Sequence, residues 1–157
     1  ESISMIQGDS TLVYVINGMF RMEDIPEGEI MPIKDAVAEP SLRMYIASSL
    51  EVEKGIHRAL APWVESGKEI LVWGVGTHTQ RLLATSDLAR ANITAYVDSN
   101  PRYHGKDLYG VPVISPHSVA DRTEPILISS RFFQNDIVRQ IREVLGFSNE
   151  LILLYKT

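Results

Sequence analysis

The chain has 157 residues, of which 45% are hydrophobic and 22% are charged, and its formal net charge is −5. This length suits one ordinary domain, and the composition is that of a globular chain rather than a disordered or fibrous one. The absence of cysteine excludes disulfides and Cys-based zinc sites, and the negative charge argues against nucleic acid or an anionic membrane as the main partner.

Residues 1–40 have the pattern of a β-hairpin followed by a loop. The run Thr11–Ile16 is rich in β-branched and aromatic residues, and Asn17-Gly18 separates it from the apolar residues 19–22. Asn-Gly between two apolar runs is typical of a type I′ hairpin turn. A lone hairpin is only marginally stable in water, so we expect this segment to pack on something, such as a preceding domain that it closes.

Residues 41–66 are predicted to form a long helix. Leu42, Ile46, Ile56 and Leu60 belong to a series of mostly apolar residues spaced by three and four. Ser41 is the expected N-cap and Gly67 the expected residue after the helix. Pro62 should kink this helix or split it into two pieces near Leu60.

From Lys68 onward, apolar strands alternate with helices. This alternation predicts an α/β fold with a Rossmann-like, doubly wound and mostly parallel sheet over residues 41–157, covered on both faces. The expected strands are 70–73, 93–97, 111–114, 125–129 and 151–155, and the expected helices between them are 77–90 and 133–145.

The most informative motif joins the first of these strands to the next helix. Gly74 permits a tight turn, Gly76 lets backbone approach a phosphate, and the helix beginning at Thr77 and His78 supplies free N–H groups. Thr77 and Gln80 have the spacing of a capping box. The loop therefore predicts an anion site, although a compact strand–helix turn without a ligand would use the same glycines.

Asp98 follows the second strand, at the position where dinucleotide-binding folds place an acidic residue on ribose hydroxyls. The same Asp begins the sequence Asp98-Ser99-Asn100-Pro101, which is also good turn chemistry. We predict Asp98, Ser99 and Asn100 as ligand-binding residues, with a purely turn-forming role as the alternative.

Ser129, Ser130 and Arg131 end the fourth strand at the same carboxyl edge, where ligands of open α/β sheets bind. Arg131 can pair with a phosphate through two N–H groups. Arg81 stands early in a helix, where the helix dipole disfavours a cation unless an anion is near. The alternative for Ser129–Arg131 is a helix-initiating serine beside an exposed arginine.

No catalytic or metal-ligating residue is predicted. None of the histidines 57, 78, 104 and 117 pairs with another at metal-ligand spacing. The chain also lacks the G-x-S-x-G nucleophile elbow and the P-loop lysine.

Several strings occur together in a recognisable order. They are residues 72–79 (VWGVGTHT), 96–101 (YVDSNP), 105–106 (GK), 110–113 (GVPV) and 126–130 (ILISS). Together they resemble the Rossmann-like C-terminal domain of class I S-adenosylmethionine-dependent methyltransferases, including sugar C-methyltransferases. They are also similar to the nucleotide-sugar- or CoA-binding N-terminal domains of bacterial sugar acetyltransferases and glycosyl-phosphate transferases. The resemblance covers about residues 45–157.

The resemblance implies a module without its own chemistry, which binds a nucleotide sugar or another phosphorylated small molecule beside an upstream catalytic domain. No cofactor is expected in the chain itself, because Val72 and His78 stand where a methyltransferase's S-adenosylmethionine loop carries an acidic residue and a third glycine. That cofactor would belong to an upstream domain, and the start at Glu1 rather than Met is consistent with a piece of a longer protein.

Two other functions stay open at this point. Asp98 and the glycine loop also suit an NAD(P)-binding oxidoreductase domain, although the third glycine is missing. A structural or oligomerisation domain without a ligand is the other alternative. No run approaches the roughly 20 apolar residues of a membrane span, and no signal-peptide pattern is visible, so we expect a cytoplasmic protein that contacts neither membrane nor nucleic acid.

Overall fold

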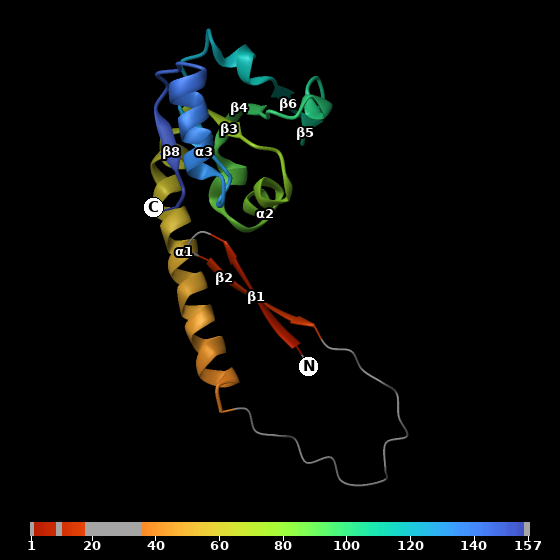
Figure 1. The fold of residues 1–157 in the computed structure, drawn as a ribbon. Helices are drawn as coiled ribbons and strands as arrows, with labels where there is room; N and C mark the ends of the chain where they lie inside the picture. The colour runs from red at the N-terminus through yellow and green to blue at the C-terminus, as the bar shows by residue number, and fades with distance from the viewer. Residues whose placement is uncertain (1, 9–10, 18–35, 156–157) are drawn as a thin grey trace. The chain divides into compact units, whose positions relative to one another are not determined.

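The computed structural model describes residues 2–8, 11–17 and 36–155 (Figure 1). Contacts between residues divide the chain into two compact units, Glu1–Ala36 and Val37–Thr157. Within the described residues, no helix combines the length and the apolar character needed to cross a membrane.

The first unit contains two antiparallel strands, β1 (Ser2–Gly8) and β2 (Thr11–Asn17), with Gly8 opposite Thr11. The expected strand Thr11–Ile16 is therefore present as β2, but the partner that the structure gives it is β1. Only two residues separate Gly8 from Thr11, which is the commonest hairpin connection. The partner expected from the sequence, residues 19–22, lies outside the described residues together with Gly18.

The second unit begins with α1 (Ala38–Ser66), which starts earlier than the predicted N-cap Ser41. Gly67 follows the helix in the left-handed region, with φ of 62°, as expected for a glycine at this position. Pro62 does not split the helix, which continues as one element to Ser66. Leu60 is buried against the sheet, so packing holds this last part of the helix in place.

Six strands of the second unit form one sheet. They are β3 (Glu69–Trp73), β4 (Asn92–Val97), β5 (Asp107–Leu108), β6 (Val111–Ile114), β7 (Ile126–Ile128) and β8 (Leu151–Leu153). Their order is β5-β6-β4-β3-β7-β8, and every pair is parallel except β5 with β6. The first strand of this sheet in the sequence, β3, lies in its interior. The next strands, β4, β5 and β6, lie on one side of β3, and β7 and β8 lie on the other.

The helical elements between the strands are mostly short. They are α2 (Thr77–Thr85), the 3₁₀ turns η1 (Asp87–Arg90), η2 (Pro101–Tyr103) and η3 (Pro116–Val119), α3 (Gln134–Arg139) and the π-helical turn η4 (Gln140–Val144). The expected helix 77–90 is interrupted at Ser86. Its hydroxyl donates to the Leu82 carbonyl (2.6 Å) and accepts from the Leu88 N–H (3.3 Å), which ends α2 and starts η1.

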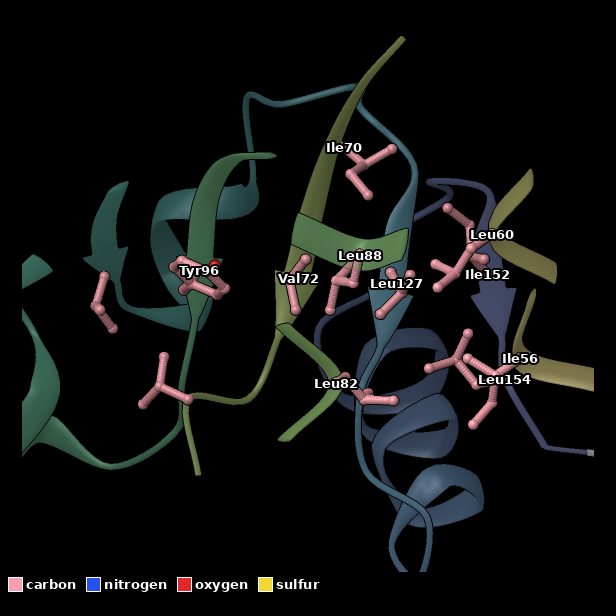
Figure 2. Close-up of a cluster of buried hydrophobic side chains, with 12 residues drawn as sticks. Ile56, Leu60, Ile70, Val72, Leu82, Leu88, Tyr96, Leu127, Ile152 and Leu154 are labelled. Carbon is pink, nitrogen blue, oxygen red and sulfur yellow. The ribbon is translucent and has the colours of Figure 1, made fainter. Parts of the chain in front are cut away.

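Alternate residues of the strands pack on opposite faces of the sheet, and both faces are covered. One apolar cluster includes Val72, Tyr96 and Leu127 and is covered by α1, α2 and η1 (Figure 2). The other includes Trp73 and Val97 and is covered by η3, α3 and η4. The structure is therefore a mixed α/β fold with a mostly parallel sheet between two layers, and this arrangement brings the carboxyl ends of five strands to one edge.

Candidate functional site

The glycine loop, residues 74–76, connects β3 to α2 at this carboxyl edge. Gly74 has φ of 105°, and a Cβ atom there would lie 2.9 Å from the Ser129 Oγ. Only glycine fits both restrictions. Gly76 has an ordinary φ of −69°, and a Cβ atom would meet open space. The fold therefore requires Gly74, whereas Gly76 leaves room in front of the loop.

A buried pair of hydroxyls supports the loop from beneath. Ser129 Oγ contacts the Trp73 carbonyl at 2.7 Å, Thr79 Oγ1 contacts the Gly74 carbonyl at 2.9 Å, and the two hydroxyls lie 2.7 Å apart. Ser129 and Thr79 are 1% and 2% exposed. The structure thus places the predicted ligand residue Ser129 under the loop, and Thr79 uses its hydroxyl to hold the loop where the dinucleotide fingerprint has a glycine.

Asp98 ties the end of β4 to the same loop. One carboxylate oxygen accepts the Val75 N–H at 3.0 Å, and the other accepts the Asn100 N–H at 2.8 Å. The carboxylate is half-buried and reaches the loop from β4, so it neighbours any ligand that the loop holds. The turn role weighed for Asp98 is present, and its contact with a ribose or sugar hydroxyl stays a prediction.

The other predicted residues at the strand ends form turns. The Asn100 side chain accepts the Arg102 N–H at 3.1 Å and caps η2. The Ser130 hydroxyl accepts the Phe133 N–H at 3.2 Å, just before α3. Ser99 is exposed, and its hydroxyl accepts a long 3.5 Å bond from the Gln140 amide.

The start of α2 is not capped by a side chain. Gly76 occupies the N-cap position and Thr77 is the first helical residue, so the capping box expected from Thr77 and Gln80 is not formed. An N-cap residue has extended backbone and stands just before the first helical residue. Gly76 has that conformation, and Thr77 is already helical, so Thr77 cannot serve as the cap. Gly76 and Thr77 are exposed. The first N–H groups of the helix, with their partial positive charge, are therefore accessible from the carboxyl edge.

His78 and Tyr155 meet across this edge. The His78 Nε2 is hydrogen-bonded to the Tyr155 hydroxyl, and the two ring centroids lie 5.8 Å apart. Tyr155 is held in turn by the buried Gln134 amide, which donates to the Tyr155 carbonyl (2.9 Å) and accepts the Tyr155 N–H (3.2 Å). The Arg131 guanidinium stands 5.9 Å from the centre of the Tyr155 ring.

Sequence reasoning missed Tyr155 and Gln134. Tyr155 follows β8 at the same edge as the other strand ends, and that position was the available signal. Gln134 offers no such signal, because its role depends on a contact with a residue 21 positions away.

Two guanidinium groups at this edge form no ion pair within the described residues. Arg81 and Arg131 are both exposed, and neither has a carboxylate partner in the described part of the chain. Burial lowers the pKa of His78, and Arg81 and Arg131 lower it further, which favours the neutral imidazole. Burial raises the pKa of Tyr155, although the same two arginines oppose the effect. An anion would find N–H donors and two guanidinium groups without carboxylate partners here.

Residues 2–8, 11–17 and 36–155 contain no group of three or more His, Cys, Asp or Glu side chains arranged to hold a metal ion. At the carboxyl edge, the structure brings together the glycine loop, Asp98, His78, Arg131 and Tyr155, with Ser129 beneath them. These groups can orient and neutralise an anionic ligand.

A family model described as "C2185-like, N-terminal" matches residues 66–153. The matched range begins at the last residue of α1 and includes all six strands of the sheet, the glycine loop and Arg131. No curated protein matches the chain, and no solved structure matches it.

Proposed function

The chain belongs to the C2185-like, N-terminal family, and we propose that residues 37–157 form a Rossmann-like module that binds a phosphorylated small molecule at its carboxyl edge. Numbered along the chain, the five parallel strands have the order 3-2-1-4-5, which is the order of the Rossmann fold through its fifth strand. In such sheets the ligand binds where the strand order reverses, and here β3 and β7 flank that point.

The phosphate would lie in front of Gly76, on the N–H groups that begin α2. The observation that carries this proposal is the pair of exposed arginines, Arg81 and Arg131, without carboxylate partners beside an uncapped helix start. Helix N-termini and arginine forks each favour phosphate, and together they favour it more than either alone.

The ligand we propose is a diphosphate of the nucleotide-sugar type. The long sheet edge offers Asp98, Ser99 and Asn100 on one side of the loop and Arg131 with Tyr155 on the other, so that hydroxyl-bearing and phosphate groups can be held at the same time. Asp98 would accept from a ribose or sugar hydroxyl. The carboxylate keeps lone pairs free beside its two backbone bonds.

The resemblance to methyltransferase C-terminal domains supplies the context of this proposal. A neighbouring domain would carry out methyl transfer with S-adenosylmethionine, and the module described here would hold the acceptor substrate. Holding reactants in position lowers the reaction barrier without an acid or base in the module itself.

The test is a calorimetric titration of the chain with UDP-glucose, UDP, pyrophosphate, uridine, CoA and NADH. We expect the diphosphates to bind and uridine not to bind. Arg131→Gln should weaken UDP-glucose binding by about tenfold or more, because a charge-assisted bond is lost. Arg58→Gln is the matched control, since Arg58 is an exposed arginine on α1.

Two outcomes would overturn the proposal. One is the absence of heat with every phosphorylated compound, and the other is an equal loss of affinity in both arginine variants. NADH binding much tighter than UDP-glucose binding would instead favour the oxidoreductase alternative.

An apolar stripe on α1 favours a second role, association with another copy of the chain. Leu42, Tyr45, Ile46 and Leu50 recur at helical spacing on α1, and between 48% and 71% of each residue is exposed. Apolar side chains at this spacing are usually covered by another helix or by a sheet. We propose that a second copy covers them.

A further inference from the structure

A pocket lies on the sheet face covered by α2 and η1, over β4 and β6. The connection from β4 to β6 contains only η2 and the two-residue strand β5, so no helix of the length of α2 covers this side. The result is a pocket of about 320 Å³. Its lining includes Ala84, Ala89, Ala91, Tyr96, Tyr109 and Val111. None of these groups belongs to the phosphate edge described above.

The floor of the pocket contains a polar atom without a partner. Tyr96 is 2% exposed, and its hydroxyl makes no hydrogen bond within the described part of the chain. The hydroxyl is not sealed in, because the described residues contain no fully buried side-chain N or O atom that lacks a partner. It therefore opens into the pocket that Tyr96 lines. Figure 2 shows Tyr96 on the side of the apolar cluster away from Leu60 and Ile152.

This hydroxyl is a neutral hydrogen-bonding group. Burial, with a smaller contribution from the nearby Tyr109, raises the pKa of Tyr96 to about 12. A neutral phenol can both donate and accept one bond. A polar group of a ligand that enters the pocket can therefore hydrogen-bond this hydroxyl in either role.

Tyr109 stands at the rim with its ring exposed. It has φ of 53° and is followed by Gly110 with φ of 81°, so that these two residues turn the chain from β5 to β6. Asp107 accepts the Gly110 N–H at 3.1 Å and fixes the turn. A left-handed tyrosine is uncommon in proteins. Tyr109 is 76% exposed as a residue, so its aromatic side chain is free to stack on a ligand ring.

We propose that this pocket binds a small, neutral, aromatic molecule that carries one hydrogen-bonding group. No charged side chain lines the pocket, and the three alanines leave room for an apolar body. The volume is near the lower end of the range of ligand pockets, roughly 300–1,000 Å³, which suits a ligand of one or two rings. The Tyr96 hydroxyl would bind its polar group, and the Tyr109 ring would cover its face.

The first test follows the backbone amides by NMR during titration with phenol. We expect saturable shifts at Leu83 and Val111, which flank the pocket, and a loss of these shifts in Ala84→Leu, which fills the space. Ala47→Leu is the control, since Ala47 is likewise an exposed helical alanine, on α1. Shifts that do not saturate, or that persist in Ala84→Leu, would overturn the proposal, as would saturable shifts confined to Gly76 and Thr77.

The second test isolates the Tyr96 hydroxyl by comparing phenol with toluene, which has a methyl group in place of the hydroxyl. Tyr96→Phe should weaken phenol binding by about five-fold, the effect of one hydrogen bond, and should leave toluene binding unchanged. Tyr103→Phe, which changes a tyrosine outside the pocket lining, should alter neither. Equal phenol affinity in the wild type and Tyr96→Phe would contradict the assigned role of this hydroxyl.

Discussion

Two glycines of one loop serve different purposes. Gly74 is required by the fold, because its backbone is left-handed and a Cβ atom would press on the buried Ser129 hydroxyl. Gly76 is required by neither backbone nor neighbours. A glycine that the fold does not need, placed at an uncapped helix start, is consistent with the close approach of a ligand.

This difference predicts opposite outcomes for two alanine substitutions. Gly74→Ala should lower the free energy of unfolding by roughly 2 kcal/mol, because it adds backbone strain and a close contact. Gly76→Ala should change it by less than about 0.5 kcal/mol, yet should weaken UDP-glucose binding because the methyl group occupies the phosphate position. Urea denaturation and calorimetry measure the two quantities. Equal destabilisation by both substitutions would contradict this interpretation.

The sequence was sufficient to find residues whose type is tied to a local rule. Gly74 follows a strand and Asp98 ends one, and the structure joins them through the Val75 N–H. It was not sufficient for Tyr155, whose hydroxyl meets His78 across 77 residues, or for the pair Thr79 and Ser129, which lie 50 residues apart. Contacts of this kind depend on strand order, which no local pattern specifies.

At the scale of elements, α1 combines a packed end with an exposed one. Ile56 and Leu60 are buried on the sheet, whereas Leu42, Tyr45 and Ile46 are exposed. A helix of 29 residues whose apolar stripe extends beyond its own sheet is typical of an element that packs on another chain or domain.

We therefore expect the chain to self-associate through this stripe. The double variant Leu42→Glu/Ile46→Glu should shift the chain toward monomer in sedimentation equilibrium, because two charges cannot be buried in an apolar contact. Met44→Glu is the control, since Met44 is exposed on the same helix but off the stripe. A wild-type chain that is monomeric at every concentration would disprove this role.

The sequence predicted most strands to within one or two residues, because buried strands leave short apolar runs. It missed β5, since two residues are too few to show a pattern. It also missed the break between α2 and η1, where the Ser86 hydroxyl competes for backbone groups within an otherwise helical pattern. The pairing of β2 with β1 was not predicted, because Ser2–Gly8 is a weaker strand pattern than Thr11–Ile16, and the pairing predicted across Asn17-Gly18 lies outside the described residues.

At the scale of the whole molecule, the parallel sheet explains how scattered residues become neighbours. Five parallel strands bring Gly76, Asp98 and Arg131 to one edge although they are far apart in the chain. The chain has a net charge of −5, yet two arginines at this edge lack carboxylate partners among the described residues. Local positive charge on an acidic chain is the feature that the phosphate proposal explains.

The most direct test of this account is an NMR titration of the chain with pyrophosphate, the simplest ligand that carries the proposed chemistry. The account predicts saturable amide shifts concentrated at Gly76, Thr77 and His78, with a second group at Arg131, and no shifts at equal concentrations of uridine. Shifts that never saturate, or that gather away from the carboxyl edge, would contradict it.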